Sequence, residues 1–204
     1  MRNDYAYVDP DHIYTDTGTN VLKNLVDIAE QDALEFFESA AVTKRIKELY
    51  DHPVKIKDST ALLAIHKYLF QDVYSWAGQK RVVEISKGGK QFFPTARFDT
   101  AFVYIDKLLA EYRAIDKADK PQIAEKLAVI LDTVNYLHPF REGNGRAQRE
   151  FMRILALEKG FELNLNPADN ANVYERYMTG CIEGDKDKLA ALILEIIQVR
   201  GIST

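Results

Sequence analysis

The sequence has little cysteine, no excess of basic residues and no long apolar run, and each absence excludes a class of protein. Cys181 is the only cysteine among 204 residues, so no disulfide can form within the chain and a reducing compartment is expected. The 31 acidic residues outnumber the 27 Lys and Arg residues, which argues against general nucleic-acid binding. Uninterrupted aliphatic runs, such as those at residues 61–65 and 127–131, are much too short to span a membrane.

The first fourteen residues are polar and lack the apolar core of a secretion signal. We therefore expect a cytoplasmic protein, or one that is delivered into the cytosol of a host cell. The chain shows no repeats, no low-complexity tracts and no linker-like change in composition. It is predicted to form a single domain over residues 1–204, with a core at about 58–199 and an N-terminal helical extension at about 1–57.

The clearest helix is predicted over residues 120–137. Asp119 is a suitable N-cap, and Pro121 fits the first turn of a helix. Pro139 disfavours helical geometry at His138, so the helix should end there. One apolar stripe follows the helical period, with residues three and four positions apart: Ile123, Leu127, Ile130, Leu131, Val134 and Leu137.

Similar periodicity predicts six more helices, so the fold class is mainly α, a helical bundle. Gly160 should end the helix that follows residue 144. Their expected ranges are about 20–50, 58–72, 97–114, 144–159, 169–182 and 185–199. One stretch differs: residues 81–86 and 91–94 are typical of two strands, with a glycine turn at 87–90 between them. We expect a short β-hairpin there.

Residues 138–149 concentrate several chemical groups in twelve positions. His138 precedes a proline at the start of a loop, where a mostly neutral imidazole can take a proton from a hydroxyl group. Gly143, Asn144 and Gly145 allow a tight turn whose backbone N–H groups, at the start of a helix, favour an anion. A structural histidine and a plain Asn-Gly turn are the alternatives for these residues taken singly.

Three arginines follow the turn on roughly one helix face: Arg146, Arg149 and Arg153. Arginine suits phosphate because its planar group donates in pairs, whereas Arg153 fits a solvated basic stripe. Glu142 precedes the turn, and a single carboxylate beside phosphates can hold Mg²⁺. Phe140 is predicted to anchor the loop in the core and Arg141 to lie at the surface. His66, Trp76 and Cys181 are interpreted as core residues.

The spacing H-x-F-x-E-G-N-G-R-x-x-R over residues 138–149 is similar to the signature of the Fic family, and all its named positions are present. Residues 72–78 (DVYSWAG) and 85–89 (ISKGG) resemble the family's approach to a β-hairpin called the flap. Residues 17–25 (TGTNVLKNL) resemble the N-terminal stretch of bacterial members. The resemblance implies the mostly helical Fic fold and transfer of AMP from ATP to a Ser, Thr or Tyr hydroxyl of a protein.

The resemblance also implies a role for each motif residue. His138 would be the general base and Glu142 would hold Mg²⁺ across the α- and β-phosphates. The turn Gly143, Asn144 and Gly145 would cradle phosphate oxygens. Arg146 would contact the β-phosphate region and Arg149 the γ-phosphate.

The flap, residues 81–93, is implied to bind the target protein by strand addition along residues 85–93. Lys87 and Gly88 would close over the nucleotide. Many family members are restrained by a glutamate that pairs with the second motif arginine. The stretch from Thr179 to Glu183 fits that pattern, but a chance match is favoured, which implies a separate small antitoxin or no restraint.

Other functions on the same site stay open. Doc-type relatives phosphorylate proteins, but their motif has a lysine-bearing variant in place of the Gly-Asn-Gly-Arg portion. The presence of Gly145-Arg146 here argues against that activity. Removal of AMP and transfer of another phosphate-containing group use the same chemistry. A binding module with a vestigial site is the non-enzymatic alternative.

Overall fold

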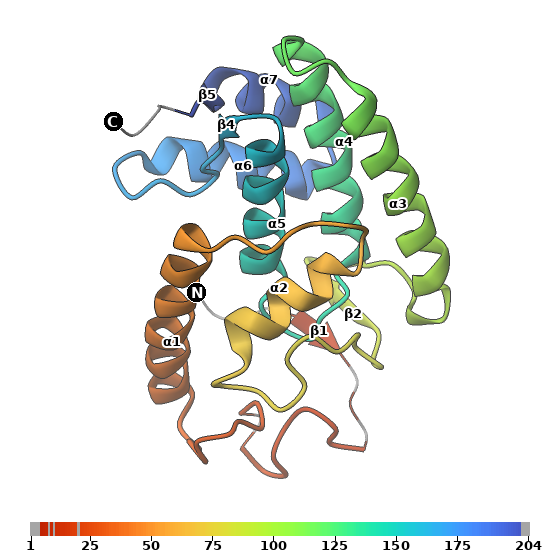
Figure 1. Cartoon of the computed structure of the whole chain (residues 1–204). Coiled ribbons are helices and arrows are strands. Elements are labelled where there is room, and N and C mark those ends of the chain that lie inside the picture. Colours follow the sequence, from red (N-terminus) through yellow and green to blue (C-terminus); the bar gives the residue numbers. More distant parts are fainter. Residues whose placement is uncertain (1–4, 8, 10, 20, 201–204) are drawn as a thin grey trace.

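Two helices joined by a six-residue loop form the centre of the structure. In the computed structural model, which describes residues 5–7, 9, 11–19 and 21–200, these are α4 (Lys120–Leu137) and α5 (Asn144–Glu158). Helices α3 (Phe98–Ala114) and α7 (Lys186–Ile196) pack against α4, and α2 (Ala61–Phe70) packs against α5 (Figure 1).

The outer helices complete the bundle. Helix α6 (Ala171–Glu183) packs against α7, and α1 (Gln31–Asp51) packs against α2. A short 3-10 helix, η1 (Thr95–Arg97), leads into α3. The predicted mainly α fold is confirmed. Of the helices formed by the described residues, none combines the length and apolar composition needed to cross a bilayer.

The loop between α4 and α5 begins and ends at residues with positive φ. Asp119 caps α4 by accepting a hydrogen bond from the Gln122 N–H at 3.0 Å, as predicted. The helix ends at His138, whose φ of 42° is left-handed. Gly143 precedes α5 with φ 79°, and a Cβ there would lie 2.2 Å from the Phe70 ring. Both the backbone conformation and the lack of space therefore require glycine at this position.

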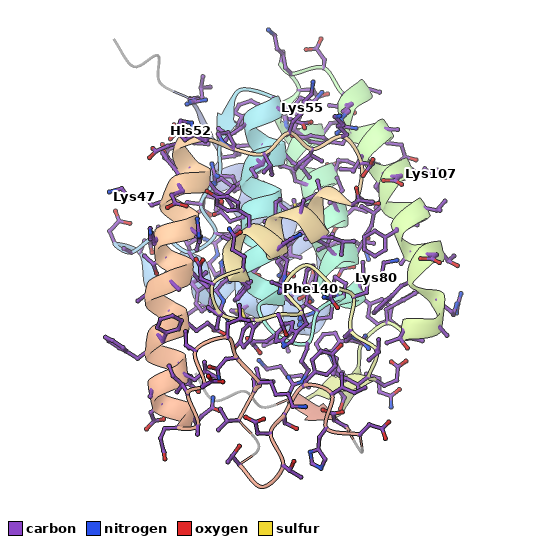
Figure 2. The ribbon with its side chains drawn as sticks, turned by 60° about the horizontal axis from the view of Figure 1, so that its bottom comes forward. Lys47, His52, Lys55, Lys80, Lys107 and Phe140 are labelled. Carbon is purple, nitrogen blue, oxygen red and sulfur yellow. The ribbon has the colours of Figure 1, made fainter. Side chains whose placement is uncertain are left out.

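The core lies where α4 and α5 face their neighbours. The predicted apolar stripe of α4 is buried throughout, and Ile123, Leu127 and Leu131 are fully inaccessible. Phe140 is also fully buried, which confirms that it anchors the loop. Figure 2 shows Phe140 inside the molecule, while charged side chains such as Lys47 and Lys107 extend from its edge.

The flap is shorter than predicted and belongs to a larger sheet. Strand β2 (Ile85–Lys87) pairs antiparallel with β3 (Lys90–Gln91) around the turn Gly88-Gly89, where both glycines have positive φ. Strand β1 (Tyr5–Tyr7) pairs with the other edge of β2. The sequence contained no signal for β1, because three residues are too few to show an alternating pattern.

Three helix boundaries differ from the prediction by three residues or more, and one of them is the start of α2 at Ala61 instead of about residue 58. Helix α1 starts at Gln31 instead of about residue 20, because the Asn24 side chain accepts hydrogen bonds from the Val26 and Ile28 N–H groups and holds a turn there. Helix α7 ends at Ile196 instead of 199. The chain continues into β5 (Gln198–Val199), which pairs antiparallel with β4 (Phe161–Glu162) after the predicted stop at Gly160.

The central position of α4 leads to a stability prediction. Leu131→Ala should reduce the free energy of unfolding by about 2–5 kcal/mol, because it leaves a cavity in a fully buried site. Val103→Ala removes an apolar side chain that is 70% exposed on α3 and should change it by less than about 0.5 kcal/mol. Urea unfolding measures both values, and equal values for the two variants would contradict the assignment of α4 to the core.

Candidate active site

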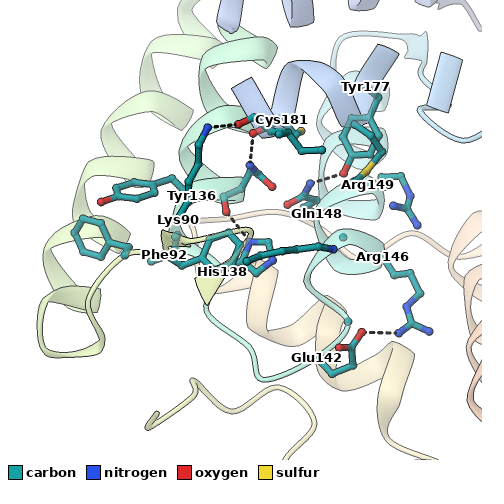
Figure 3. Close-up of a pocket in the computed structure, with 18 of the residues that line it drawn as sticks. Lys90, Phe92, Tyr136, His138, Glu142, Arg146, Gln148, Arg149, Tyr177 and Cys181 are labelled. Atoms are coloured by element: carbon teal, nitrogen blue, oxygen red, sulfur yellow. Dashed lines mark hydrogen bonds and ion pairs between the residues drawn. The ribbon is translucent and has the colours of Figure 1, made fainter. Parts of the chain in front are cut away.

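A cavity of about 1380 Å³ opens where the α4–α5 loop, the flap, α6 and α1 meet (Figure 3). It brings together most of the residues predicted from the sequence. Asn144 and Gly88 are the exceptions and do not line it. The predicted residues that line the cavity are Lys87, His138, Glu142, Gly143, Gly145, Arg146 and Arg149.

His138 is held in one tautomer. Its Nδ1 donates a hydrogen bond to the carbonyl oxygen of Asn135 at 2.6 Å, and a carbonyl can only accept. The lone pair of the neutral ring is therefore on Nε2. The Phe92 ring stacks on the imidazole at a centroid distance of 3.7 Å. Burial lowers the pKa of His138 to about 3, so the ring is neutral at neutral pH.

His66 holds the loop from the opposite side. Its Nδ1 accepts a hydrogen bond from the Gly78 N–H, and its Nε2 donates one to the carbonyl oxygen of Glu142, both at 2.9 Å. The ring also stacks on Phe140 at 3.7 Å. The expectation that His66 is a core residue is confirmed, and its contacts position the residue that carries the predicted metal ligand.

The Glu142 carboxylate has one oxygen engaged and one without a partner. Oε1 accepts a hydrogen bond from Arg146 Nη2 at 3.3 Å. Oε2 is buried and has no hydrogen-bond partner among the described residues. The residues that the structure describes contain no cluster of three or more His, Cys, Asp or Glu side chains arranged to hold a metal. A metal at Glu142 would therefore take most of its ligands from water or phosphate.

The start of α5 presents backbone N–H groups. The first hydrogen bonds within the helix run from the Arg146 and Ala147 N–H groups to the carbonyl oxygen of Gly143. The earlier N–H groups have no partner in the helix, as at any helix N-terminus. The Asn144 side chain points away and bonds to both the N–H and the carbonyl oxygen of Phe140. It stabilises the loop, so only its backbone can contribute to an anion site.

The two motif arginines have different surroundings. Arg146 forms an ion pair of 2.6 Å with Glu38 of α1, and its guanidinium lies 4.7 Å from the centre of the Phe70 ring. Arg149 lies against the rings of Tyr174 and Tyr177 at 5.6 and 5.9 Å. Within the described part of the chain, no carboxylate lies within ion-pair distance of Arg149.

The inhibitory pattern that starts at Thr179 does not reach Arg149. Glu183 lies at the end of α6 and pairs with Lys188 at 2.5 Å. The interpretation of this pattern as a chance match agrees with that geometry.

The family assignment follows from sequence relatives. A model described as the Fic/DOC family matches residues 57–156. The probable protein adenylyltransferase y4lH of Sinorhizobium fredii is 33% identical over 88% of this chain and 91% of its own length. The chain belongs to the Fic/DOC family.

Other Fic proteins are similar over much of the chain. Protein adenylyltransferase VbhT of Bartonella schoenbuchensis is 35% identical over 88% of this chain, which spans 38% of the length of VbhT. The structure of BepC from Bartonella tribocorum with bound AMPPNP has a TM-score of 0.80 at 21% identity, covering 93% of this chain and 98% of that one. A Fic domain from Bartonella quintana with bound ADP has a TM-score of 0.81 at 20% identity, covering 93% and 96%. These likenesses confirm the Fic fold.

Three residues of the Fic site were missed by sequence reasoning. Glu38 and Tyr74 line the cavity, and the Tyr74 hydroxyl donates a hydrogen bond to the Glu38 carboxylate. Burial raises the pKa of Glu38, and Arg146 opposes that shift. Gln148 donates to the Tyr177 hydroxyl, while its buried Oε1 has no partner among the described residues. The only signal for Gln148 in the sequence was its position three residues after Gly145 on the same helix.

Two arginines of the Fic motif region lie elsewhere than predicted. Arg141 was expected at the surface and Arg153 on a solvated stripe, but both are buried, at 5% and 9% exposure. Arg153 pairs with Glu150 at 2.9 Å and donates to the carbonyl oxygen of Leu49 at 3.0 Å. It therefore serves the packing of α5 against the end of α1. A charge pattern on one helix cannot reveal such a partner on another.

The two neutral histidines of the Fic site predict how stability depends on pH. Burial lowers the pKa of both His66 and His138 to about 3, whereas the unfolded chain takes up protons below about 6.5. Each should therefore reduce the free energy of unfolding by about 1.4 kcal/mol per pH unit as the pH falls through this window. His66→Gln should give a shallower pH dependence in urea unfolding between pH 7 and 4.5. An unchanged slope would contradict the buried neutral state of His66.

Proposed function

We propose that this chain transfers AMP from ATP to the hydroxyl group of a Ser, Thr or Tyr side chain of a target protein. The observation that carries the proposal is the neutral, tautomer-fixed His138 in one cavity with Glu142, Arg146 and Arg149. The names of the relatives at 33% and 35% identity support the same reaction. The nucleotides bound in the similar Bartonella structures support ATP as the co-substrate.

In this proposal His138 is the general base. Nε2 takes the proton from the target hydroxyl as its oxygen forms a bond to the α-phosphorus of ATP. The bond between the α-phosphorus and the oxygen that bridges to the β-phosphorus breaks, and pyrophosphate leaves with that oxygen. A base in this position contributes about 10² to 10⁴ in rate. The Asn135 carbonyl keeps the ring in the required tautomer and orientation.

Glu142 is the residue that would hold Mg²⁺. Its buried Oε2 lacks a partner among the described residues, and a hard cation would satisfy it. When bound, Mg²⁺ neutralises phosphate charge as it develops in the transition state. Groups of this chain would neutralise the rest of the phosphate charge. These are the N–H groups at the start of α5, Arg146 near the β-phosphate and Arg149 near the γ-phosphate. Lys87 of the flap lines the same cavity and adds a positive charge.

The target would lie along the flap, residues 81–93, at the outer edge of β3, because β1 and β3 already pair with the two edges of β2. In strand addition most hydrogen bonds are made to the backbone of the bound segment. This mode therefore suits a target that presents an extended segment with a Ser, Thr or Tyr residue. Gly88 is at the exposed tip of the flap, where a Cβ atom would have no atom within 4 Å apart from its chain neighbours.

Restraint by a small inhibitory antitoxin protein is also proposed. A carboxylate of that protein would pair with Arg149, which lies against the rings of Tyr174 and Tyr177.

Labelled ATP distinguishes AMP transfer from other reactions. Cell lysate incubated with the protein should acquire label from α-labelled ATP, and His138→Ala should reduce this at least about 100-fold, because the base is lost. His52→Ala, at the exposed end of α1, should match the unaltered protein. Label from γ-labelled ATP alone would indicate a protein kinase instead. A lack of label from either ATP, with folded protein, would indicate a non-catalytic binding module.

Glu142→Ala tests the metal assignment. The variant should lose Mg²⁺-dependent transfer by about 10²-fold or more while it remains folded, because the carboxylate is the ligand that the chain supplies. Transfer rates are measured over a range of Mg²⁺ concentrations, with circular dichroism as the control for folding. A rate equal to that of the unaltered protein at limiting Mg²⁺ would mean that Glu142 is not the ligand.

A further inference from the structure

Glu38 is a buried carboxylate that reaches the site from outside the signature. It lies on α1, which precedes the residues matched by the Fic family model, and it is 8% exposed. Its side chain lines the same cavity as Glu142 and Arg146. A carboxylate at this depth requires partners. Here the partners are the Tyr74 hydroxyl and the Arg146 guanidinium.

One nitrogen of Arg146 is shared by two carboxylates, and the sharing is unequal. Nη2 is 2.6 Å from Glu38 Oε1 and 3.3 Å from Glu142 Oε1. The shorter contact is a close ion pair, and the longer one is a hydrogen bond that exceeds the usual length between charged groups. Glu38 therefore takes most of the interaction with Arg146. The Glu142 carboxylate keeps one weakly engaged oxygen and one without a described partner (Figure 3).

Loss of this restraint would change both predicted ligand groups. Arg146 and Glu142 are four residues apart, close enough for the guanidinium to move onto the carboxylate. A full ion pair there would occupy the free oxygen and place a positive charge where a cation has to bind. The competition would weaken cation binding at Glu142 and misplace the arginine relative to the phosphates.

We propose that Glu38 is a positioning residue that holds the Arg146 guanidinium and thereby keeps the Glu142 carboxylate available for a divalent cation. The proposal rests on the proposed function, because it takes Glu142 as the cation ligand. It extends the site to a helix that the signature does not cover. It also gives Tyr74 a role, since its hydroxyl orients the Glu38 carboxylate from the other side.

The test is Glu38→Gln, which removes the charge and keeps the shape. Binding of the ATP analogue AMPCPP, in which a methylene group replaces the oxygen between the α- and β-phosphates, is measured by calorimetry over a range of Mg²⁺ concentrations. The Mg²⁺ concentration for half-maximal binding should rise about tenfold, a change of about 1.4 kcal/mol. AMPCPP blocks the bond that AMP transfer would break, so this readout is independent of activity. Transfer should fall less at saturating Mg²⁺ and ATP than at limiting Mg²⁺.

Glu35→Gln is the matched control. Glu35 lies one turn earlier on α1, lines the same cavity and pairs only with Gln31 among the described residues. The Glu35→Gln variant loses the same charge, but Glu35 contacts no arginine of the site. The Mg²⁺ concentration that this variant needs for half-maximal binding should therefore not change. Glu38→Asp retains the charge on a shorter side chain and should give a smaller increase than Glu38→Gln. It also serves as the second variant if Glu38→Gln does not fold.

A double-mutant cycle tests whether the effect passes through Arg146. In an Arg146→Met background, Glu38→Gln should not raise the Mg²⁺ requirement further, because no guanidinium remains to be restrained. A further tenfold increase in that background would overturn the proposal.

Two other results would also overturn it while leaving the proposed function intact. One is a Mg²⁺ requirement of Glu38→Gln equal to that of Glu35→Gln. The other is a lower requirement, which would mean that Glu38 competes with phosphate for Arg146. Failure of the unaltered protein to bind AMPCPP at any Mg²⁺ concentration would instead reject the proposed function.

Discussion

The buried guanidinium of Arg81 joins the flap to the loop that carries the site. The guanidinium donates to the carbonyl oxygens of His138 at 2.9 Å, Val83 at 2.6 Å and Phe93 at 2.6 Å. The backbone N–H of Arg81 donates to the carbonyl oxygen of Pro139. These carbonyls belong to the start of the flap, the end of the flap and the loop that follows α4. A buried guanidinium is tolerated only where its donors are satisfied, so the three segments are constrained together. The position of Phe92 over the His138 ring depends on this constraint.

The loop is held equally firmly on its opposite side. His66 and Asn144 bond to backbone groups of Glu142 and Phe140, so polar contacts fix the loop from within α2 and α5. The same burial that orders the loop removes water from both histidines and keeps them neutral. Rigidity and acid–base state therefore have one physical origin. A site of this kind needs little reorganisation when a substrate arrives.

Much of this arrangement could be predicted, because its information is local in sequence. The period of α4, its cap at Asp119 and its end before Pro139 depend on neighbouring residues, and so does the spacing of the motif. The contributions of Glu38 and Arg81 could not be predicted. Glu38 depends on a partner in a distant helix, and Arg81 bonds to backbone carbonyls, which leave no pattern in a sequence. The flap strands were overestimated because Arg81, not a strand ladder, holds residues 81–84.

The left-handed backbone of His138 has a consequence for how the protein evolves. A residue with a side chain that adopts φ of 42° reduces the stability of the fold by about 1 kcal/mol or more relative to glycine, which adopts it freely. Stability alone would therefore favour glycine or asparagine at this position. Drift without selection on activity would tend to remove the imidazole before it removed the fold. Stability and activity therefore make opposite demands on the residue at position 138.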